Sequence, residues 1–460
     1  MSDLSQIVKA YDVRGTVPDQ WDERTAEALG AAFTQVLNAA GEPGDAVLIA
    51  HDMRATGPAL AAAFAVGVRA EGRSVIELGL GSTDMLYYAS GALSLPGAMF
   101  TASHNPAQYN GIKMCRSGAR PIGQDSGLAD IRDRAQAMLA GGERPAGEPQ
   151  APAERRDLLA DYAGYLRKLV DLSTIRPLKV VVDAGNGMGG YTVPTVLGDA
   201  ALPALPLQIV PLYFELDGTF PNHEANPLDP KNLVDLQRAV VAHSADIGLA
   251  FDGDADRCFV IDERGEPVSP SAITALVAAR ELAKHPGSTV IHNAITSRAV
   301  PEIIREHGGV PVVTRVGHSF IKAEMARTNA IFGGEHSAHY YFRDFWFADT
   351  GMLAAMHTLA ALGEQSQPLS IMASVYERYT ASGEINSTVG DQAARVAEVR
   401  AAYPEAEAEE LDGLTLRFPD GAWFNLRASN TEPLLRLNVE GPSAERMISL
   451  RDEVLERVRR

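Results

Sequence analysis

Apolar runs that end in polar or glycine-rich loops recur along the chain. Three of them are AVLIAHDMRATG from Ala46, LKVVVDAGNGMGG from Leu178 and STVIHNAITSR from Ser288, and a stretch with a helix-like pattern follows each. A strand followed by a helix is the unit from which α/β domains are built. The pattern therefore predicts repeated βα units, although the three sequences share little beyond it.

Two changes in this pattern mark candidate domain boundaries. Residues 140–157 are rich in Gly, Pro, Ala and Glu without an apolar period, which is typical of a linker or an exposed crossing. The second change lies near 363–370. Beyond it, two strand-like runs, WFNLRA and LLRLNV, flank a polar loop and precede the helical segment ERMISLRDEVLERV, which indicates a smaller α+β unit. A length of 460 residues suits several domains rather than a single core.

Composition excludes several classes of protein. No window approaches the 18 or so uninterrupted apolar residues of a membrane span, and the N-terminal MSDLSQIVKAYDVRG has no signal-peptide pattern, so we expect a cytoplasmic protein without a membrane partner. The cysteines, Cys115 and Cys258, lie far apart and indicate no disulfide framework. A net charge of −18 argues against nucleic-acid binding, so an anionic substrate has to be bound by locally placed Arg and Lys.

The segment ADIGLAFDGDADRCFVID places Asp252, Asp254 and Asp256 at alternate positions of a tight loop between apolar runs. Such carboxylates can converge on one hard cation and leave positions open for a phosphate, which favours Mg²⁺. A calcium loop is one alternative because Glu263 falls at the twelfth position, but the sixth is Arg257 instead of Gly and a strand-like run follows. A solvated Asp-rich turn without an ion is the other alternative.

The segment GAMFTASHNPAQYNGIKM delivers Ser103 and His104 into a loop after an apolar run. An ordinary turn is a serious alternative, because Ser, Asn and Pro are common in loops and Asn110-Gly111 is a hairpin signal. If Ser103 instead carries a phosphoryl group, it brings about two negative charges and becomes a fourth partner of the metal.

The charge of such a site has to be balanced. Three carboxylates and a phosphate dianion carry about −5 against +2 from Mg²⁺, and each unit charge pair at ~4 Å is worth on the order of 4 kcal/mol. The nearby cations in the sequence are Arg257, His104 and Lys113. Lys113 can also act as a general base or acid on a sugar hydroxyl if burial beside other cations lowers its pKa. A surface lysine is the alternative.

The tail loop FNLRASNTEPLLRLNV combines two arginines with hydroxyl and amide donors between strand-like runs, a suitable cradle for a phosphate monoester. Taken alone, the Ser-Asn-Thr sequence is also typical of an ordinary turn without a bound phosphate. The residues concerned are Arg427, Ser429, Asn430, Thr431 and Arg436.

Two further polar segments, TRVGHSFIK and FGGEHSAHYYFRD, interrupt strand-rich stretches. In the second, Glu335 and Ser337 can bind a diol by accepting from and donating to adjacent hydroxyls. A single histidine in such a segment is more often structural or exposed than functional. The other candidates are Gly317, His318, Ser319, His336 and His339.

Gly185, Gly187 and Gly190 match a dinucleotide-binding fingerprint after a strand. The acidic residue expected about 20 positions later is missing from ALPALPLQIVP, and Glu215 comes late. We therefore interpret the glycines as a tight strand-to-helix turn and not as a nicotinamide site.

Taken together, these segments resemble the α-D-phosphohexomutase superfamily, and within it the phosphomannomutase/phosphoglucomutase group. The resemblance covers nearly the whole chain and rests on YDVRG at Tyr11, TASHNP at Thr101, DGDADR at Asp252, GEHSAH at Gly334 and RASNTEP at Arg427, in the family's order and spacing. It implies a magnesium-dependent intramolecular phosphotransferase, an isomerase that interconverts the 1-phosphate and 6-phosphate of mannose, and also of glucose, through a phosphoserine and a hexose 1,6-bisphosphate.

The fold implied by the resemblance is α/β, with four domains around a central cleft: three similar α/β domains with mixed sheets and a smaller C-terminal α+β domain. Closure of the fourth domain, with 363–370 as hinge, is expected to keep water from the phosphoserine. We expect a monomer or homodimer with one Mg²⁺ per chain and a sugar phosphate as its small-molecule partner. The expected ranges are 1–150 (phosphoserine loop), 151–257 (metal loop), 258–368 (sugar loop) and 369–460 (phosphate loop).

The resemblance also implies roles for individual residues. Ser103 carries the phosphoryl group, and Arg14 and Arg257 assist its transfer. The catalytic set is Ser103, His104, Lys113, Arg14, Arg257, His318 and His339, of which Lys113 and the last two are the candidates for proton handling. The metal ligands are Ser103, Asp252, Asp254 and Asp256. The substrate-binding set is Tyr11, Gly317, Glu335, Ser337, Arg427, Ser429, Asn430, Thr431 and Arg436.

Departures from the family's pattern concern the substrate. The phosphoglucosamine branch usually has Gln at His336 and Gly at Asn430, which disfavours that alternative, and Ala338 stands where a Gly is common. A serine-dependent sugar phosphatase shares the nucleophile and metal but has no need of the tail phosphate clamp. A non-catalytic sugar-phosphate sensor is a third hypothesis, against which the complete set of Ser103, the aspartates and Lys113 argues.

Overall fold

The computed structural model describes residues 3–141, 153–429 and 434–460. Most of the predicted linker 140–157 therefore lies outside the described residues.

Contacts between residues divide the chain into two compact units. Unit 1 comprises Met1–Val268 and His339–Ser370, and unit 2 comprises Ser269–Ala338 and Ile371–Arg460. Helix α12 (Leu369–Ser374) carries the chain from unit 1 into unit 2 for the last time.

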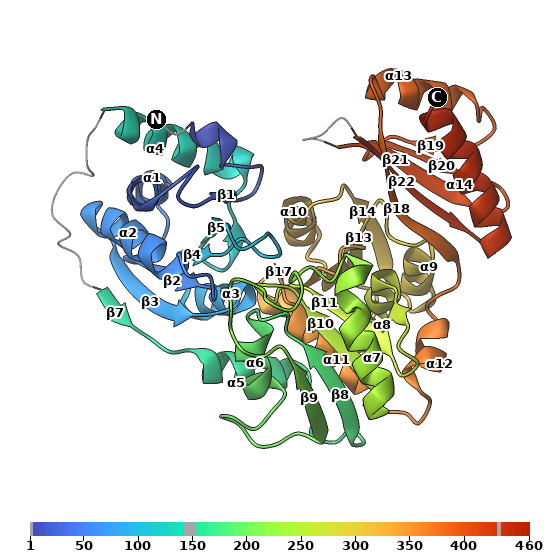
Figure 1. Cartoon of the computed structure of the whole chain (residues 1–460), viewed down its shortest axis with the longest axis horizontal. Coiled ribbons are helices and arrows are strands. Elements are labelled where there is room, and N and C mark those ends of the chain that lie inside the picture. The colour runs from blue at the N-terminus through green and yellow to red at the C-terminus, as the bar shows by residue number, and fades with distance from the viewer. Residues whose placement is uncertain (1–2, 142–152, 430–433) are drawn as a thin grey trace. The chain divides into compact units, whose positions relative to one another are not determined.

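A mixed sheet forms the N-terminal part of unit 1. Its strands are β1 (Val13–Thr16), β2 (Ala46–His51), β3 (Ser74–Leu80), β4 (Gly97–Phe100), β5 (Tyr109–Arg116), β6 (Arg120–Pro121) and β7 (Ala153–Arg155). They lie in the order β1-β5-β4-β2-β3-β7, with β6 beside β5 (Figure 1). Strand β2 is parallel to β3 and β4, whereas β5 is antiparallel to β4 and β1. The first predicted strand, from Ala46, is confirmed as β2.

Helices cover both faces of this sheet because β2 is apolar on both. Val47 and Ile49 belong to one hydrophobic cluster with residues of three helices, whereas Leu48 and Ala50 pack with Leu86 in a second cluster. Successive residues of a strand point to opposite faces, which accounts for this alternation. The first cluster includes α1 (Glu23–Ala39), α2 (Gly57–Ala70) and α4 (Leu128–Gly141), and the second includes α3 (Thr83–Leu93); short 3₁₀ turns are η1 (Leu4–Gln6) and η2 (Gln124–Ser126).

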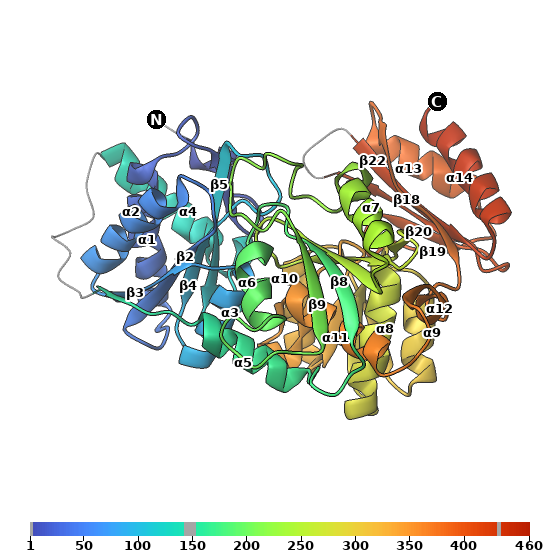
Figure 2. The ribbon, with the colours of Figure 1, turned by 60° about the horizontal axis from the view of Figure 1, so that its bottom comes forward.

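A second mixed sheet follows in unit 1. Its strands are β8 (Leu178–Asp183), β9 (Leu207–Leu212), β10 (Ile247–Phe251), β11 (Cys258–Asp262) and β12 (Pro267–Val268), in the order β12-β11-β10-β8-β9. Strand β8 is parallel to β9 and β10, and β11 is antiparallel to β10. The second predicted strand is confirmed as β8. The helices of this part are α5 (Leu159–Leu169), α6 (Gly189–Val196) and α7 (Val234–His243), and the 3₁₀ turn η3 (Pro230–Leu233) precedes α7. Helices α6 and α7 lie on opposite sides of the sheet (Figure 2).

Unit 2 begins with three parallel strands. Strand β13 (Thr289–Asn293) lies between β14 (Val310–Thr314) and β15 (Phe332–Gly334), and it confirms the third predicted strand. The helices of this part are α8 (Pro270–Lys284), α9 (Ala299–Glu306) and α10 (His318–Thr328).

The chain then returns to unit 1 with an antiparallel hairpin. The hairpin is followed by the buried helix α11 (Gly351–Gly363), whose apolar pattern the sequence displays. The hairpin consists of β16 (Tyr340–Phe342), η4 (Arg343–Phe345) and β17 (Ala348–Asp349).

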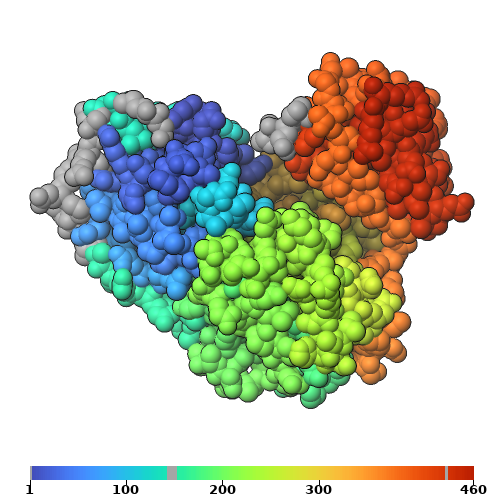
Figure 3. All heavy atoms as spheres, viewed as in Figure 1, coloured from blue at the N-terminus to red at the C-terminus, as the bar shows by residue number. Residues whose placement is uncertain are grey.

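The C-terminal part of unit 2 is an antiparallel sheet with two helices, which confirms the predicted α+β tail. Its strand order is β18-β22-β21-β20-β19. Helices α13 and α14 form much of its surface in the view of Figure 3. The elements are β18 (Thr380–Thr388), α13 (Gln392–Ala401), β19 (Glu407–Glu409), β20 (Leu414–Arg417), β21 (Trp423–Ala428), β22 (Leu434–Gly441) and α14 (Ala444–Val458).

Two expectations from composition can be compared with the fold. Cys115 and Cys258 are both buried, and neither forms a disulfide with a described residue. Over the described ranges, the search for a helix with the length and apolar character of a membrane span finds none.

Candidate functional site

The loop between β10 and β11 holds three aspartates close together. Both strands are buried, and Ala255 in the loop has a left-handed φ of +61°. Asp252, Asp254 and Asp256 are at most 1% exposed, and one oxygen from each lies within 4.8 Å of the others. The solvated turn and the calcium loop are therefore both wrong, since the acids are buried and a buried strand follows them.

Lys113 on β5 neutralises two of these carboxylates. Its Nζ donates to Asp254 Oδ2 at 2.7 Å and to Asp256 Oδ2 at 2.6 Å. Burial lowers the pKa of Lys113, but the two carboxylates raise it more, so its pKa is well above its usual range. A general-base role for Lys113 requires a lowered pKa, and the raised pKa contradicts that condition. Lys113 is a fixed positive charge in this structure.

Ser103 and Arg257 meet at the third carboxylate. Ser103 Oγ donates to Asp252 Oδ2 at 2.8 Å, and Arg257 binds the same oxygen through Nε at 2.9 Å and Nη2 at 2.8 Å. Burial raises the pKa of Asp252 to about 7 although Arg257 opposes the shift. The structure thus brings together the serine segment and the aspartate loop, which lie about 150 positions apart in sequence.

The donor set fits a divalent cation. Burial and the neighbouring Asp256 raise the pKa of Asp254, but Lys113 and the Thr83 hydroxyl bring its net pKa below the usual value. In the described part of the chain, the Oδ1 atoms of Asp254 and Asp256 are buried and accept no hydrogen bond. Buried carboxylate oxygens without donors are costly unless a cation satisfies them, and oxygen ligands suit Mg²⁺.

His104 does not contribute positive charge, in contrast to the expectation from sequence. Burial, followed by the charges of Arg257 and Arg14, lowers the pKa of His104 to about 2. Its Nδ1 lies 2.6 Å from Arg257 Nη2 and 3.2 Å from Ser103 Oγ. A neutral imidazole therefore accepts from the guanidinium beside the candidate nucleophile.

The backbone of the serine loop is tightly fitted to its surroundings. Ser103 has a φ of +49°, a region that non-glycine residues rarely occupy. A Cβ on Gly253 would lie 2.3 Å from the Ser103 carbonyl oxygen, so only glycine allows the metal loop to approach. Asn110 and Gly111 belong to β5 and not to a turn, so the hairpin interpretation of that pair is wrong.

The glycine-rich segment after β8 forms the predicted strand-to-helix turn. Gly185 has a φ of +52°, and α6 begins at Gly189. The Met188 amide donates to the Gly253 carbonyl at 2.9 Å, and a Cβ on Gly187 would lie 2.7 Å from that oxygen. These glycines therefore support the metal loop from behind.

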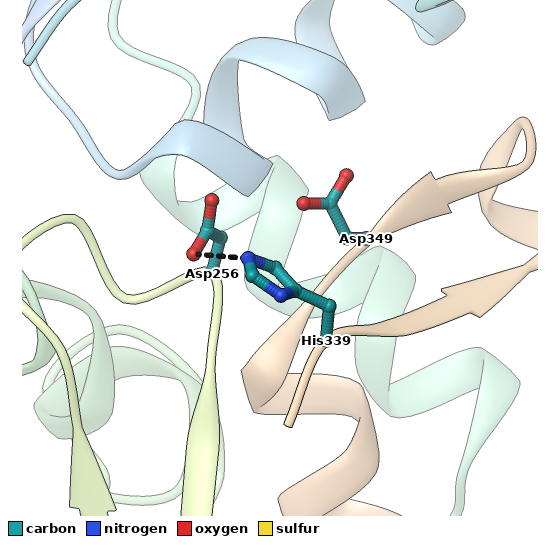
Figure 4. Close-up of side chains that lie close together, drawn as sticks. All are labelled: Asp256, His339 and Asp349. Atoms are coloured by element: carbon teal, nitrogen blue, oxygen red, sulfur yellow. Dashed lines mark ion pairs between the residues drawn. The ribbon is translucent and has the colours of Figure 1, made fainter. Parts of the chain in front are cut away.

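Arg14 and His339 flank this centre. Arg14 reaches the serine loop indirectly, since its Nη1 donates to Asn105 Oδ1 at 2.7 Å. His339 Nε2 lies 3.8 Å from Asp256 Oδ1 (Figure 4). Tyr11 is half-buried in the segment before β1.

In unit 2, the segment after β15 presents Glu335 and Ser337. Glu335 is 3% exposed, and its Oε2 accepts from Asn293 Nδ2 at 3.3 Å and from Ser337 Oγ at 3.4 Å. A carboxylate held by an amide and next to a hydroxyl can accept from one sugar hydroxyl while the serine donates to its neighbour.

Arg427 and Arg436 lie opposite each other on β21 and β22. Glu384 of β18 holds both: Arg427 Nη2 donates to its Oε2 at 2.7 Å and Arg436 Nη1 to its Oε1 at 3.3 Å. The predicted arginine pair is thus assembled, and Ser429 follows β21 directly. Asn430 and Thr431 lie outside the described residues.

Gly317 and His318 begin helix α10 of unit 2. Gly317 is the N-cap, with a φ of +131° that favours glycine. The pKa of His336 is lowered by burial and by Arg427, against Glu384, so the sugar segment and the arginine pair share one electrostatic environment within this unit.

Sequence reasoning missed Arg54, which is 2% exposed behind the serine loop. A signal was present: Asp52 and Arg54 directly follow β2, at the carboxyl end of a parallel strand, where α/β proteins place functional groups.

It also missed polar residues whose partners are distant in sequence. Thr83 Oγ1 donates to Asp254 at 2.5 Å, and the buried Asp84 accepts from Tyr162 Oη at 2.6 Å and Thr350 Oγ1 at 2.7 Å. Asp349 at the end of β17 faces His339 (Figure 4). Nothing local in the sequence marks these residues.

Family models match successive parts of the chain. They describe phosphoglucomutase/phosphomannomutase: the α/β/α domains I, II and III at residues 5–139, 160–265 and 269–379, and the C-terminal domain at 384–457.

Relatives of similar sequence and a solved structure agree with these matches. The chain is 43% identical over 437 residues to a protein of Xanthomonas campestris pv. campestris described as phosphohexose mutases, with 94% of each covered. It is 40% identical over 440 residues to the phosphomannomutase of Salmonella typhimurium, again with 94% of each covered. The crystal structure of a phosphoglucomutase/phosphomannomutase family protein from Burkholderia thailandensis superimposes with a TM-score of 0.88 at 31% identity, covering 100% of this chain and 98% of that one.

Proposed function

Because the chain belongs to the phosphoglucomutase/phosphomannomutase family, we propose that it is a phosphomannomutase that also accepts glucose phosphate. Family membership supports a phosphohexomutase; the preferred sugar and the phosphoserine route are our proposal. The observation that carries it is the 2.8 Å contact between Ser103 Oγ and Asp252, within a buried trio of carboxylates.

In the proposed reaction, phosphorylated Ser103 donates its phosphoryl group to the C6 hydroxyl of hexose 1-phosphate. The hydroxyl oxygen bonds to phosphorus, the bond from phosphorus to Ser103 Oγ breaks, and the hydroxyl proton passes to a base. The resulting hexose 1,6-bisphosphate turns around. Ser103 Oγ then bonds to the phosphorus at C1, the bond from that phosphorus to the C1 oxygen breaks, and the base returns its proton to the C1 oxygen, which leaves hexose 6-phosphate and phosphorylated Ser103. Ser103 is 5% exposed, so water has little access to compete with the sugar.

The fixed charges around Ser103 fit phosphoryl transfer, which depends mainly on positioning and charge neutralisation. A Mg²⁺ ion held by Asp252, Asp254 and Asp256 would supply charge neutralisation at the transferring group. Arg257 binds the same Asp252 oxygen that Ser103 Oγ contacts, so its guanidinium lies close to the serine. Lys113 keeps the carboxylates of Asp254 and Asp256 in place. Since the pKa of Lys113 is raised, we propose His339 as the base, with His318 as the alternative.

Unit 2 carries the groups proposed to recognise the substrate. Glu335 and Ser337 would bind adjacent sugar hydroxyls, with Gly317 at the neighbouring helix start. Arg427, Ser429 and Arg436 would bind the phosphate that is not being transferred, because a pair of guanidinium groups matches the geometry of phosphate oxygens.

The test is to incubate the purified chain with mannose 1-phosphate, Mg²⁺ and a trace of mannose 1,6-bisphosphate, and to follow the 6-phosphate and free phosphate together. We expect 6-phosphate without free phosphate, and no turnover by Ser103→Ala. Free phosphate as the main product would identify a phosphatase, and no product at all a sensor. Undiminished turnover by Ser103→Ala would refute the phosphoserine route.

Substrate choice is tested in the same assay with glucose 1-phosphate and glucosamine 1-phosphate. Mannose and glucose differ only at the C2 hydroxyl, and relatives at 34–40% identity are named phosphomannomutase. We expect turnover of both hexoses and poor turnover of the amino sugar. A preference for glucosamine 1-phosphate would overturn this assignment.

A further inference from the structure

The segment of unit 1 that connects β9 to η3 lies against residues that support Ser103. We call residues 213–226 of this segment the brace loop. All of them belong to the described part of the chain, and they form no helix or strand. Connecting segments usually run over the surface and vary freely, but Ala225 of the brace loop is 1% exposed. The loop is therefore part of the packed structure.

The brace loop is tied to the carboxyl end of β8 and to the turn that follows it. The backbone amide of Asn186 donates to the Tyr213 carbonyl at 2.9 Å, and its side-chain amide donates to the Glu215 carbonyl at 2.9 Å. His223 Nε2 lies 3.0 Å from Asp183 Oδ2. Asn186 and Asp183 are 3% and 1% exposed, so these contacts are shielded from water and favour a single conformation of the loop.

Phe220 and Gly218 of the brace loop lie against Arg54. Arg54 Cζ is 5.2 Å from the centroid of the Phe220 ring, within the range of a cation–π interaction. A Cβ on Gly218 would lie 2.8 Å from Arg54 Cα, so the two backbones are in close contact. Arg54 Nε and Asp52 Oδ2 form an ion pair at 3.3 Å, but neither atom has a hydrogen bond among the described residues. Asp52 thus offsets the charge, and the ring restricts one face of the guanidinium.

The brace loop also reaches the metal loop. A Cβ on Gly253 would lie 2.3 Å from the Ser103 carbonyl oxygen and 3.7 Å from Ala225 Cβ, so both groups lie on the same side of Gly253. Arg54 donates to that same carbonyl oxygen. The Ser103 carbonyl is therefore held where the serine loop, the metal loop and the brace loop meet.

We propose that the brace loop positions Ser103 for phosphoryl transfer, and that Phe220 is its positioning residue because it orients the guanidinium of Arg54. Phosphoryl transfer requires the attacking and leaving oxygens to lie roughly in line. A small displacement of Ser103 Oγ therefore slows the chemical step more than it weakens binding of the sugar. This catalytic effect rests on the proposed phosphoserine route, whereas the mechanical link from Phe220 to the serine loop does not.

The kinetic test replaces Phe220 by leucine, which keeps apolar bulk but removes the negative face of the ring. We expect kcat for mannose 1-phosphate to fall about five- to twentyfold, with KM changed less than about twofold. Phe220→Tyr keeps the ring and should retain kcat within about twofold of the wild type. All three side chains carry a Cβ, so the φ of +53° at this position does not distinguish them. Equal losses of kcat in both variants would refute the role of the ring.

Phe418→Leu is the matched control. Arg446 Cζ lies 5.5 Å from the centroid of the Phe418 ring, in the C-terminal part of unit 2, so the substitution removes an interaction of the same kind. It should leave both kcat and KM unchanged. If Phe418→Leu lowers kcat as much as Phe220→Leu does, the loss is not specific to the brace loop and the proposal fails.

Hydrogen exchange followed by mass spectrometry reports on the serine loop without turnover. In Phe220→Leu, the amides of a peptide that covers residues 101–109 should exchange at least about fivefold faster, while a peptide from α1 exchanges at the wild-type rate. Gly218→Ala, which places a methyl group against the Arg54 backbone, should have the same effect and gives the test if Phe220→Leu does not fold. Unchanged exchange in the serine loop would overturn the proposal. This result can be read even if the chain proves to be a phosphatase, so the two failures are distinguishable.

Discussion

Arg54 Nη2 donates to the carbonyl oxygen of Ser103 at 2.9 Å. The same guanidinium also donates to the carbonyls of Asn105 at 2.6 Å and of Pro106 and Tyr109 at 2.9 Å each. One buried cation thus gathers four backbone oxygens of the serine loop. It offers a physical reason why Ser103 can remain in a left-handed conformation that costs on the order of 1–3 kcal/mol.

Replacing Arg54 by lysine should therefore slow the reaction more than it weakens substrate binding. Lysine keeps the charge but loses the planar fork that bonds several carbonyls at once. We expect kcat to fall at least about tenfold, equivalent to about 1.4 kcal/mol, with KM changed less than threefold. Steady-state kinetics and the rate of Ser103 phosphorylation by hexose 1,6-bisphosphate check this.

Arg24→Lys is the matched control, since Arg24 is exposed on α1 in the same domain. It should behave as the wild type. If Arg54→Lys retains full kcat, the guanidinium contributes nothing to the position of Ser103. If it raises only KM, Arg54 acts on substrate binding instead.

Magnesium should stabilise the chain as well as activate it. The ion would satisfy Asp254 Oδ1 and Asp256 Oδ1, which are buried without hydrogen bonds in the described residues. A ligand at 100 times its dissociation constant adds about 2.7 kcal/mol to the stability of the folded state. We expect EDTA to lower the thermal midpoint, excess Mg²⁺ to restore it, and Asp254→Asn to lose most of that response.

Asp130→Asn, an exposed change on α4, is the control for this experiment and should respond to Mg²⁺ as the wild type does. An equal magnesium response in Asp254→Asn would mean that the ion binds elsewhere.

The stability of unit 1 should depend on the protonation of Asp84. Burial raises the pKa of this carboxyl from 3.8 to about 6, although three hydroxyl donors oppose the shift. The folded state therefore holds the proton more tightly than the unfolded state. The resulting stabilisation is fully present below about pH 4 and is lost as the pH rises through about 6.

Asp84→Asn removes this titration. Its stability relative to the wild type should increase between pH 4 and pH 7 by up to about 3 kcal/mol, which corresponds to a pKa shift of about two units. Thermal midpoints measured across this range give the difference. Asp161→Asn, at an exposed position of α5, should show no such trend. A flat difference for Asp84→Asn would indicate that its pKa is not raised.

The parts of the site that the sequence predicts are those carried by short, unusual segments. Three acids at alternate positions between two apolar runs leave few interpretations other than a metal-binding loop. In the structure the three carboxylates converge as expected. The repeated βα pattern likewise predicts β2, β8 and β13, because an apolar run that ends in a polar loop has few other structures open to it.

The features that the sequence does not predict are those created by folding. The pKa of Lys113 rises because of carboxylates more than 100 positions away in the chain. The pKa of His104 falls because of burial and, after that, because of the charge of Arg257, which is also more than 100 positions away. Asp84 and Asp349 act through partners that only the tertiary structure brings near. The misleading hairpin signal at Asn110-Gly111 has a similar cause, since pairing of β5 with β1 and β4 overrides the local preference of the dipeptide.

Glu384 should limit the affinity of the arginine pair for phosphate. Its carboxylate already occupies donors of Arg427 and Arg436, so a substrate phosphate has to displace it. Glu384 is 27% exposed, which limits its effect through solvent screening. Glu384→Gln removes the competing charge and keeps the shape. We expect KM for mannose 1-phosphate to fall about three- to tenfold, and inhibition by inorganic phosphate to strengthen in parallel, as measured by initial rates.

Glu445→Gln, on the exposed start of α14, is the matched control and should change neither value. A rise in KM for Glu384→Gln would instead mean that Glu384 is needed to hold the two guanidinium groups in position, and that the phosphate binds to a pair preorganised by this carboxylate.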